Sequence, residues 1–149
     1  VDLVYLDPPY TADNYSRFYH ALEALARYDY PALDTGPGGR ILRGRYPQGR
    51  FQSGFCSKET VEDEFRRVIF AAAGAGAKLV VSYASPTGLL FKRYARKWPA
   101  DDPVKRMEGL CLEGFRDVRT ARLPMMHSGQ GDSNLRIEEL LVVCTRPRT

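Results

Sequence analysis

The chain has 149 residues, of which 44% are hydrophobic and 27% are charged. This balance is typical of a soluble globular domain with a core of its own. No run approaches the roughly 18 apolar residues of a membrane span, so we expect no contact with a membrane. The formal net charge is +4, which suits a polyanionic partner without identifying one.

Cysteine and histidine residues are few and scattered. The sequence holds three cysteines, Cys56, Cys111 and Cys144, and none of them forms a C-x-x-C pair. With only two histidines in the chain, we expect no metal site. Scattered cysteines of odd number are typical of reduced thiols in a cytoplasmic protein.

The chain opens on an apolar segment, Val1–Leu6 (VDLVYL), which predicts a strand buried on both faces. Pro8 and Pro9 end this strand because proline cannot donate a ladder hydrogen bond. A helix is predicted over Ser16–Tyr28, with an apolar stripe formed by Phe18, Leu22, Leu25 and Ala26. Since Val1 is not Met and leads directly into a strand, we expect the chain to be part of a longer protein.

The middle of the chain predicts a crossover between two parallel strands. Residues Asp34–Gln52 form a long irregular segment, and a helix capped by Ser57 or Thr60 follows it. A second strand with a buried pattern is predicted over Lys78–Ala84 (KLVVSYA). The order strand, helix, helix, strand implies that the two strands run parallel.

Two further helices are predicted over Thr87–Lys97 and Pro103–Leu112. Two strands, Phe115–Pro124 and Ile137–Thr145, are expected to form an antiparallel hairpin at the edge of the sheet. The predicted fold class is therefore α/β, in a single domain over residues 1–149.

A rigid polar segment, Asp7-Pro8-Pro9-Tyr10, follows the first predicted strand. In open α/β sheets, ligands bind beyond the carboxyl ends of the parallel strands. Each proline restricts the residue before it to extended geometry, so Asp7 and Pro8 are held extended. The Asp7 carboxylate and the Pro8 carbonyl are then two fixed hydrogen-bond acceptors.

Two fixed acceptors suit an exocyclic –NH2 group such as adenine N6, which has two hydrogens to donate. Binding both hydrogens favours a pyramidal nitrogen whose lone pair points toward an electrophile. Tyr10 offers a flat face for stacking the base. A base within a duplex cannot reach such a pocket, so we expect the target nucleotide to be flipped out.

The segment LDPPY resembles the catalytic motif of amino-methyltransferases that use S-adenosylmethionine. Together with TADNYSRFYHALEAL and the later FQSGFCSKETVEDEFRRVI, it resembles bacterial adenine-specific DNA methyltransferases in particular. The resemblance covers most of residues 1–85. It implies the second half of a Rossmann-like methyltransferase sheet that ends in an antiparallel hairpin.

The resemblance assigns the catalytic role to Asp7, Pro8, Pro9 and Tyr10, and it implies that Asp7 also contacts the methyl donor. It implies S-adenosylmethionine as donor, DNA as partner, and adenine-specific methylation of the restriction–modification kind, without an obligate protein partner. The family's glycine-rich donor motif is expected on an earlier strand, and Gly74-Ala75-Gly76 precedes a strand rather than following one. We therefore expect a partial catalytic domain that binds donor poorly by itself.

An arginine-rich segment between residues 40 and 58 lacks acidic side chains and carries interleaved aromatic residues. The predicted nucleic-acid contacts are Tyr10, Tyr15, Arg45, Arg50 and Phe55. Two alternatives remain open. One is an amino-methyltransferase that acts on RNA, for instance at guanine N2 of ribosomal RNA, and the other is a nucleic-acid-binding fragment without catalytic activity.

Overall fold

The computed structural model describes residues 1–44, 46–49, 51–85, 87–126 and 136–148. The chain divides into two compact units, each of which is described by itself. Unit 1 comprises Val1–Ala12 and Gly54–Thr149, and unit 2 comprises Asp13–Ser53. The sequence predicts a single domain over residues 1–149, and the division into two units leaves this a prediction.

Over its described residues, unit 1 is an open four-stranded sheet with the order β1-β2-β4-β3. Its strands are β1 (Leu3–Leu6), β2 (Lys78–Ser85), β3 (Phe115–Met126) and β4 (Arg136–Pro147). β1 and β2 run parallel, whereas β4 pairs antiparallel with both β2 and β3. The predicted α/β class, the parallel crossover and the antiparallel pair at the sheet edge are confirmed.

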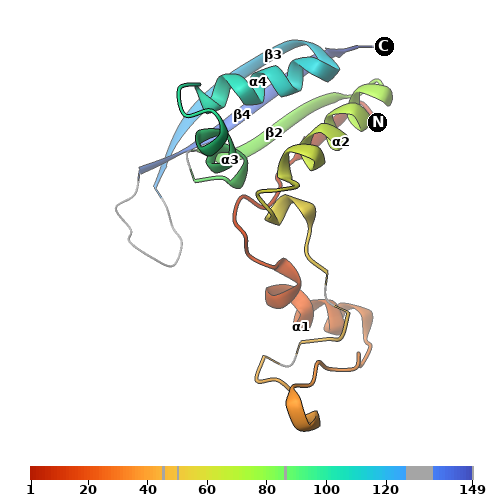
Figure 1. Cartoon of the computed structure of the whole chain (residues 1–149). Coiled ribbons are helices and arrows are strands. Elements are labelled where there is room, and N and C mark those ends of the chain that lie inside the picture. The colour runs from red at the N-terminus through yellow and green to blue at the C-terminus, as the bar shows by residue number, and fades with distance from the viewer. Residues whose placement is uncertain (45, 50, 86, 127–135, 149) are drawn as a thin grey trace. The chain divides into compact units, whose positions relative to one another are not determined.

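Helices α2 (Val61–Gly74), α3 (Leu89–Lys97) and α4 (Pro103–Gly114) lie on one face of this sheet (Figure 1). Each helix turns an apolar stripe toward the strands, as 3.6-residue periodicity requires. The core between helices and sheet is built largely from Val61, Phe65, Ile69, Leu79, Val81, Tyr83, Leu90, Phe91, Met107, Phe115, Leu140 and Val142. This layer fixes the carboxyl ends of β1 and β2 relative to α3.

The other face of the sheet carries exposed apolar side chains on β1. Val4 and Leu6 pack on the core, whereas Leu3 and Tyr5 are 53% and 61% exposed. The prediction that the first strand is buried on both faces is therefore wrong. The described helices cover one face only, and β1 is the outermost strand of the described sheet, so alternate side chains of an apolar run remain open to solvent.

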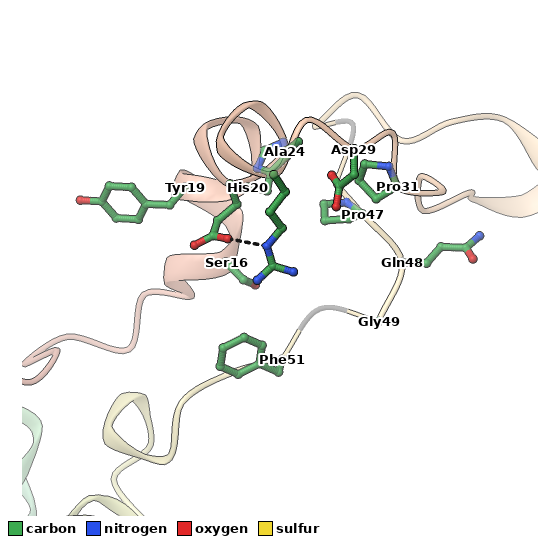
Figure 2. Close-up of a pocket in the computed structure, with 12 residues that line it drawn as sticks. Ser16, Tyr19, His20, Ala24, Asp29, Pro31, Pro47, Gln48, Gly49 and Phe51 are labelled. Carbon is green, nitrogen blue, oxygen red and sulfur yellow. Dashed lines mark ion pairs between the residues drawn. The ribbon is translucent and has the colours of Figure 1, made fainter.

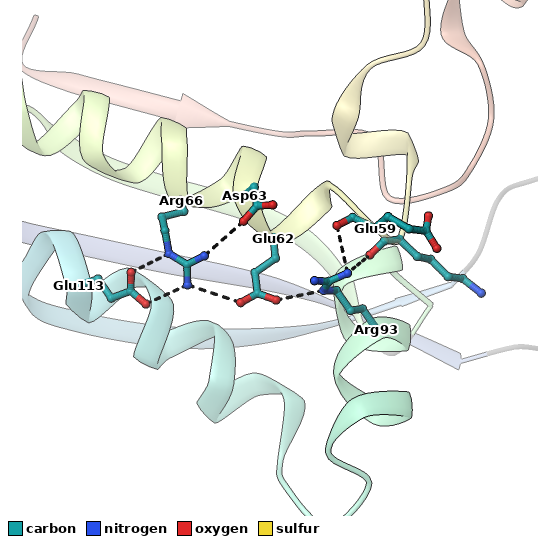
Figure 3. Close-up of polar contacts among 7 residues, drawn as sticks. Glu59, Glu62, Asp63, Arg66, Arg93 and Glu113 are labelled. Carbon is teal, nitrogen blue, oxygen red and sulfur yellow. Dashed lines mark hydrogen bonds and ion pairs between the residues drawn. The ribbon is translucent and has the colours of Figure 1, made fainter.

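An ion-pair network ties the three helices of unit 1 together (Figure 3). Arg66 of α2 binds Glu113 of α4 at 2.8 Å, and Glu62 of α2 binds Arg93 of α3 at 3.0 Å. The Arg66 guanidinium holds the pKa of the Glu113 carboxyl below its usual value. Arg93 also donates to the Lys58 carbonyl at 2.6 Å, which fixes the segment that leads into α2.

Unit 2 consists of α1 (Tyr15–Arg27) and an irregular segment that contains a short 3-10 helix, η1 (Pro37–Gly39). Asn14 caps α1 by accepting from the Ser16 N–H at 3.0 Å, and Tyr28 ends it in a left-handed conformation (φ 54°). Leu22 and Leu25 of the predicted stripe are 60% and 71% exposed. These two leucines of the predicted stripe are thus not covered within unit 2.

The remaining features constrain function less. All three cysteines are buried, and none forms a disulfide within the described part of the chain. Among the described residues no helix is long and apolar enough to cross a membrane. In the same part of the chain no three His, Cys, Asp or Glu side chains are grouped so that they can hold a metal ion.

The open edge of β1 predicts self-association of the isolated chain. Tyr5→Lys places a charge on the exposed strand and is expected to shift the chain from large assemblies toward monomer, because edge lysines oppose strand pairing. Size-exclusion chromatography with light scattering measures this shift. Phe70→Lys, at a 48% exposed position on α2, is the matched control and should leave assembly unchanged. A monomeric parent chain would contradict the prediction.

Candidate active site

The predicted catalytic segment lies at the carboxyl edge of the parallel strands. β1 ends at Leu6, whose partner in β2 is Val81, and Asp7-Pro8-Pro9-Tyr10 follows directly. Pro8 is buried, whereas Asp7 is exposed. The buried proline fixes the backbone while the carboxylate reaches solvent, which is the arrangement that a binding group for an incoming ligand requires.

Continuing the register by one residue brings Asp7 beside Ser82 of β2, on the face of the sheet opposite the described helices. On that face the Ser82 hydroxyl donates to the Glu139 carboxylate of β4. Asp7 makes no hydrogen bond or ion pair with any residue in the described part of the chain. Its carboxylate oxygens are thus open to a donor from outside.

Tyr10 is held from two sides. Its carbonyl accepts from the Leu89 N–H at 3.0 Å, and its ring meets the Tyr83 ring edge-on with centroids 6.5 Å apart. The Tyr83 hydroxyl accepts from the Leu90 N–H at 3.1 Å. The first amides of α3, which lack partners within the helix, are therefore satisfied by the catalytic segment and by β2.

The start of α3 requires glycine. Gly88 caps the helix in extended geometry, and an added Cβ would lie 2.3 Å from Cε1 of Tyr83. A larger residue would therefore push the Tyr83 ring away from Tyr10 and from the Leu90 amide. Neither Glu139 nor Gly88 was among the predicted site residues. The acidic pair inside the otherwise apolar run IEELLVVCT is the feature of the sequence that could have identified Glu139.

The predicted nucleic-acid contacts fall in both units. Phe55 belongs to unit 1 and packs edge-on against Phe65, with centroids 5.3 Å apart. Tyr15 begins α1 in unit 2, and its side chain lies outside the described residues, as do Arg45 and Arg50. Their contacts with nucleic acid, and the catalytic roles of the four-residue segment, stay predictions.

A family model and a curated relative that match this chain both describe methylases. Residues 1–38 match the D12 class N6 adenine-specific DNA methyltransferase family, and this range includes Asp7-Pro8-Pro9-Tyr10. The chain is 32% identical over 123 residues to modification methylase LlaI of Lactococcus lactis subsp. lactis, covering 80% of the chain and 16% of that protein. The chain is thus similar to N6 adenine-specific DNA methyltransferases.

Other relatives carry the same kind of name. Type II methyltransferase M.FokI of Planomicrobium okeanokoites is 36% identical over 91 residues, covering 61% of the chain and 13% of that protein. Type II methyltransferase M.NlaIII of Neisseria lactamica is 37% identical over 68 residues, covering 46% of the chain and 18% of that protein. The chain thus spans less than a fifth of the length of these relatives. No solved structure matches it.

Gly88→Ala tests the contact between α3 and the catalytic segment. The new methyl group would displace the Tyr83 ring, and we expect a loss of about 1–3 kcal/mol in the free energy of unfolding. Urea denaturation measures this loss. Gly109→Ala is the control, because no atom lies within 4 Å of its added Cβ in the middle of α4. It should be neutral or stabilise by about 0.5–1 kcal/mol, since alanine favours a helix. Equal stability of both variants would contradict the assignment.

The raised pKa of the Tyr83 phenol predicts that the protein loses stability at high pH. Burial raises the pKa of its phenol from 10.0 to about 12, so the folded state favours the neutral hydroxyl. The resulting stability is complete below pH 10 and is lost as pH rises toward about 12. Tyr83→Phe should be less stable by about 1 kcal/mol below pH 10, because the Leu90 amide loses its acceptor.

The comparison of the two proteins across the pH range isolates the phenol from other titrating groups. The stability difference between parent and Tyr83→Phe, measured by thermal or urea unfolding, should shrink as the pH approaches 12. A difference that stays constant up to that pH would show that the phenol does not titrate as expected.

Proposed function

We propose that the chain carries the amine-binding half of a site that methylates N6 of adenine in DNA, with S-adenosylmethionine as the methyl donor. The observation that carries this proposal is the position of Asp7-Pro8-Pro9-Tyr10, directly after β1 and anchored through Tyr10 to α3. The family match over residues 1–38 and the names of the relatives support it.

The chemistry assigned to the chain is hydrogen-bond acceptance at two fixed points. The Asp7 carboxylate accepts one hydrogen of the adenine amine, and the Pro8 carbonyl accepts the other. This geometry draws the nitrogen lone pair out of conjugation with the ring and directs it at the incoming methyl group. Once the new N–C bond forms, one amine proton leaves along its hydrogen bond to Asp7, and Tyr10 stacks on the base throughout.

The donor supplies a methyl group bound to a sulfonium, which leaves as a neutral thioether. Asp7 is the residue of this chain that we expect to face the donor, because its carboxylate is exposed at the carboxyl edge of β1. Gly76 precedes β2, at the opposite edge of the sheet, and thus does not fit the donor. The described residues therefore fit the amine better than the rest of the donor molecule.

DNA is the proposed partner. The target adenine would be flipped out of the duplex to reach Asp7, while Tyr15, Arg45, Arg50 and Phe55 contact the strand around it. By analogy with the named modification methylases, the biological role is protection of a recognition sequence within a restriction–modification system, in the cytoplasm. Methylation of RNA is the alternative, because the same two acceptors would hold any exocyclic amine.

Asp7→Ala in the intact protein tests the proposal. Loss of one acceptor should lower the rate of methyl transfer to DNA by about 10²–10³, comparable with removal of one preorganised hydrogen-bond partner in other enzymes. Transfer of labelled methyl groups to duplex DNA and to structured RNA, measured side by side, gives the rate and the substrate class.

Asp117→Ala is the matched control for this experiment. Asp117 lies on β3 and pairs with Arg146, and its replacement should leave the rate unchanged. Full activity of Asp7→Ala would remove the catalytic assignment, and labelling confined to RNA would replace DNA as the substrate.

A further inference from the structure

Unit 2 contains a cavity of about 620 Å³ that the catalytic segment does not share. One wall is a single face of α1, formed by Ser16, Tyr19, His20, Glu23 and Arg27. The other wall is formed by Pro47, Gln48, Gly49 and Phe51, and Figure 2 shows Phe51 across an open space from the helix. The volume falls within the range of sites for small ligands.

The walls of the cavity are fixed within unit 2. The Gln48 N–H donates to the Ala32 carbonyl at 2.8 Å, and the Gln48 side-chain amide donates to the Leu33 carbonyl at 3.2 Å. Leu33 and Pro47 also form a β-bridge. Because these contacts join the beginning and the end of the irregular segment, the cavity is built by the fold of this unit.

The lining has the chemistry of a site for a flat ring that carries an amine. Phe51 is 75% exposed, which leaves its ring free to be covered by a stacked partner. The charged groups are two carboxylates, Glu23 and Asp29, and one guanidinium, Arg27, which pairs with Glu23 at 3.1 Å. The excess of carboxylate disfavours a phosphate and provides acceptors for amine hydrogens.

Exposed arginines on the same irregular segment complement this lining. Arg40 and Arg43 are exposed and lie outside the cavity. Positive charge suited to a phosphate backbone is thus separated from an aromatic and carboxylate cavity suited to a base. Proteins that bind single nucleotides of a strand combine these two elements.

We propose that this cavity binds a second nucleobase of the DNA, one with an exocyclic amine, and that it contributes to recognition of the sequence around the methylated adenine. The base stacks on Phe51, and its amine donates to Asp29. This inference rests on DNA as the proposed substrate and adds a base-reading site that shares no residue with Asp7-Pro8-Pro9-Tyr10.

The experiment uses the intact protein and a duplex that contains its methylated sequence, found by mapping methylated adenines after expression in an unmethylated host. Each adenine, guanine or cytosine around the target is replaced in turn by an analogue without the exocyclic amine. Binding is measured by fluorescence anisotropy, separately from methyl transfer. The parent protein should lose about tenfold in affinity at one position, as expected for one lost base contact.

Phe51→Ala and Asp29→Asn test whether the cavity makes that contact. Phe51→Ala should weaken binding of the parent duplex by about 5- to 100-fold, the range for loss of one stacked base. Asp29→Asn should bind the parent duplex more weakly and respond to the sensitive analogue less than twofold. Tyr30→Ala, a 90% exposed aromatic residue outside the cavity, is the control and should keep the full response.

The outcomes separate the two proposals. If no position responds in the parent protein, or if Asp29→Asn and Phe51→Ala respond as strongly as the parent, the cavity does not read a base. If no adenine of the host DNA is methylated, the proposed function fails. The anisotropy measurements are then made on duplexes selected for binding by the parent protein, and they still decide whether the cavity binds a base.

Discussion

The contact between α3 and the predicted catalytic segment, Asp7-Pro8-Pro9-Tyr10, is the constraint on which the candidate site depends. The first two amides of α3 donate to the Tyr10 carbonyl and to the Tyr83 hydroxyl, at 3.0 and 3.1 Å. Helix amides at this position need partners from outside the helix, and here they join α3 to β2 and to the segment that follows β1. Tyr10 is thus fixed to two elements that are themselves part of the core.

This contact connects the core of unit 1 to the predicted catalytic segment. The Tyr83 ring packs edge-on against Phe65, Phe91 and Tyr10, so it joins α2, α3 and the catalytic segment. The ion pair of Arg66 with Glu113 joins α2 to α4, and that of Arg93 with Glu62 joins α3 to α2, so both pairs fix the orientation of the helices. A change that moves the Tyr83 ring therefore alters the packing of Tyr10.

Periodicity and strand order were sufficient to predict the α/β class, the parallel β1–β2 pair and the antiparallel edge. They failed for β1, because an apolar run does not reveal whether a layer covers each face, and Leu3 and Tyr5 are exposed. The position of Asp7 followed from the prolines after the strand. Glu139 did not follow, since its partner Ser82 lies far away in sequence. Gly88 did not follow either, because the need for glycine depends on where the fold places the Tyr83 ring.

The predicted catalytic segment directs its side chains to both faces of the sheet. Tyr10 packs on the face that the helices cover, whereas the register directs Asp7 toward the face that they leave open. Parallel strands are usually covered on both faces, so the exposed side chains of β1 mark a surface suited to a further layer. Any layer that covers Leu3 and Tyr5 would also adjoin Asp7. That layer would bury the exposed side chains of β1, and it would also close the proposed amine site from the solvent.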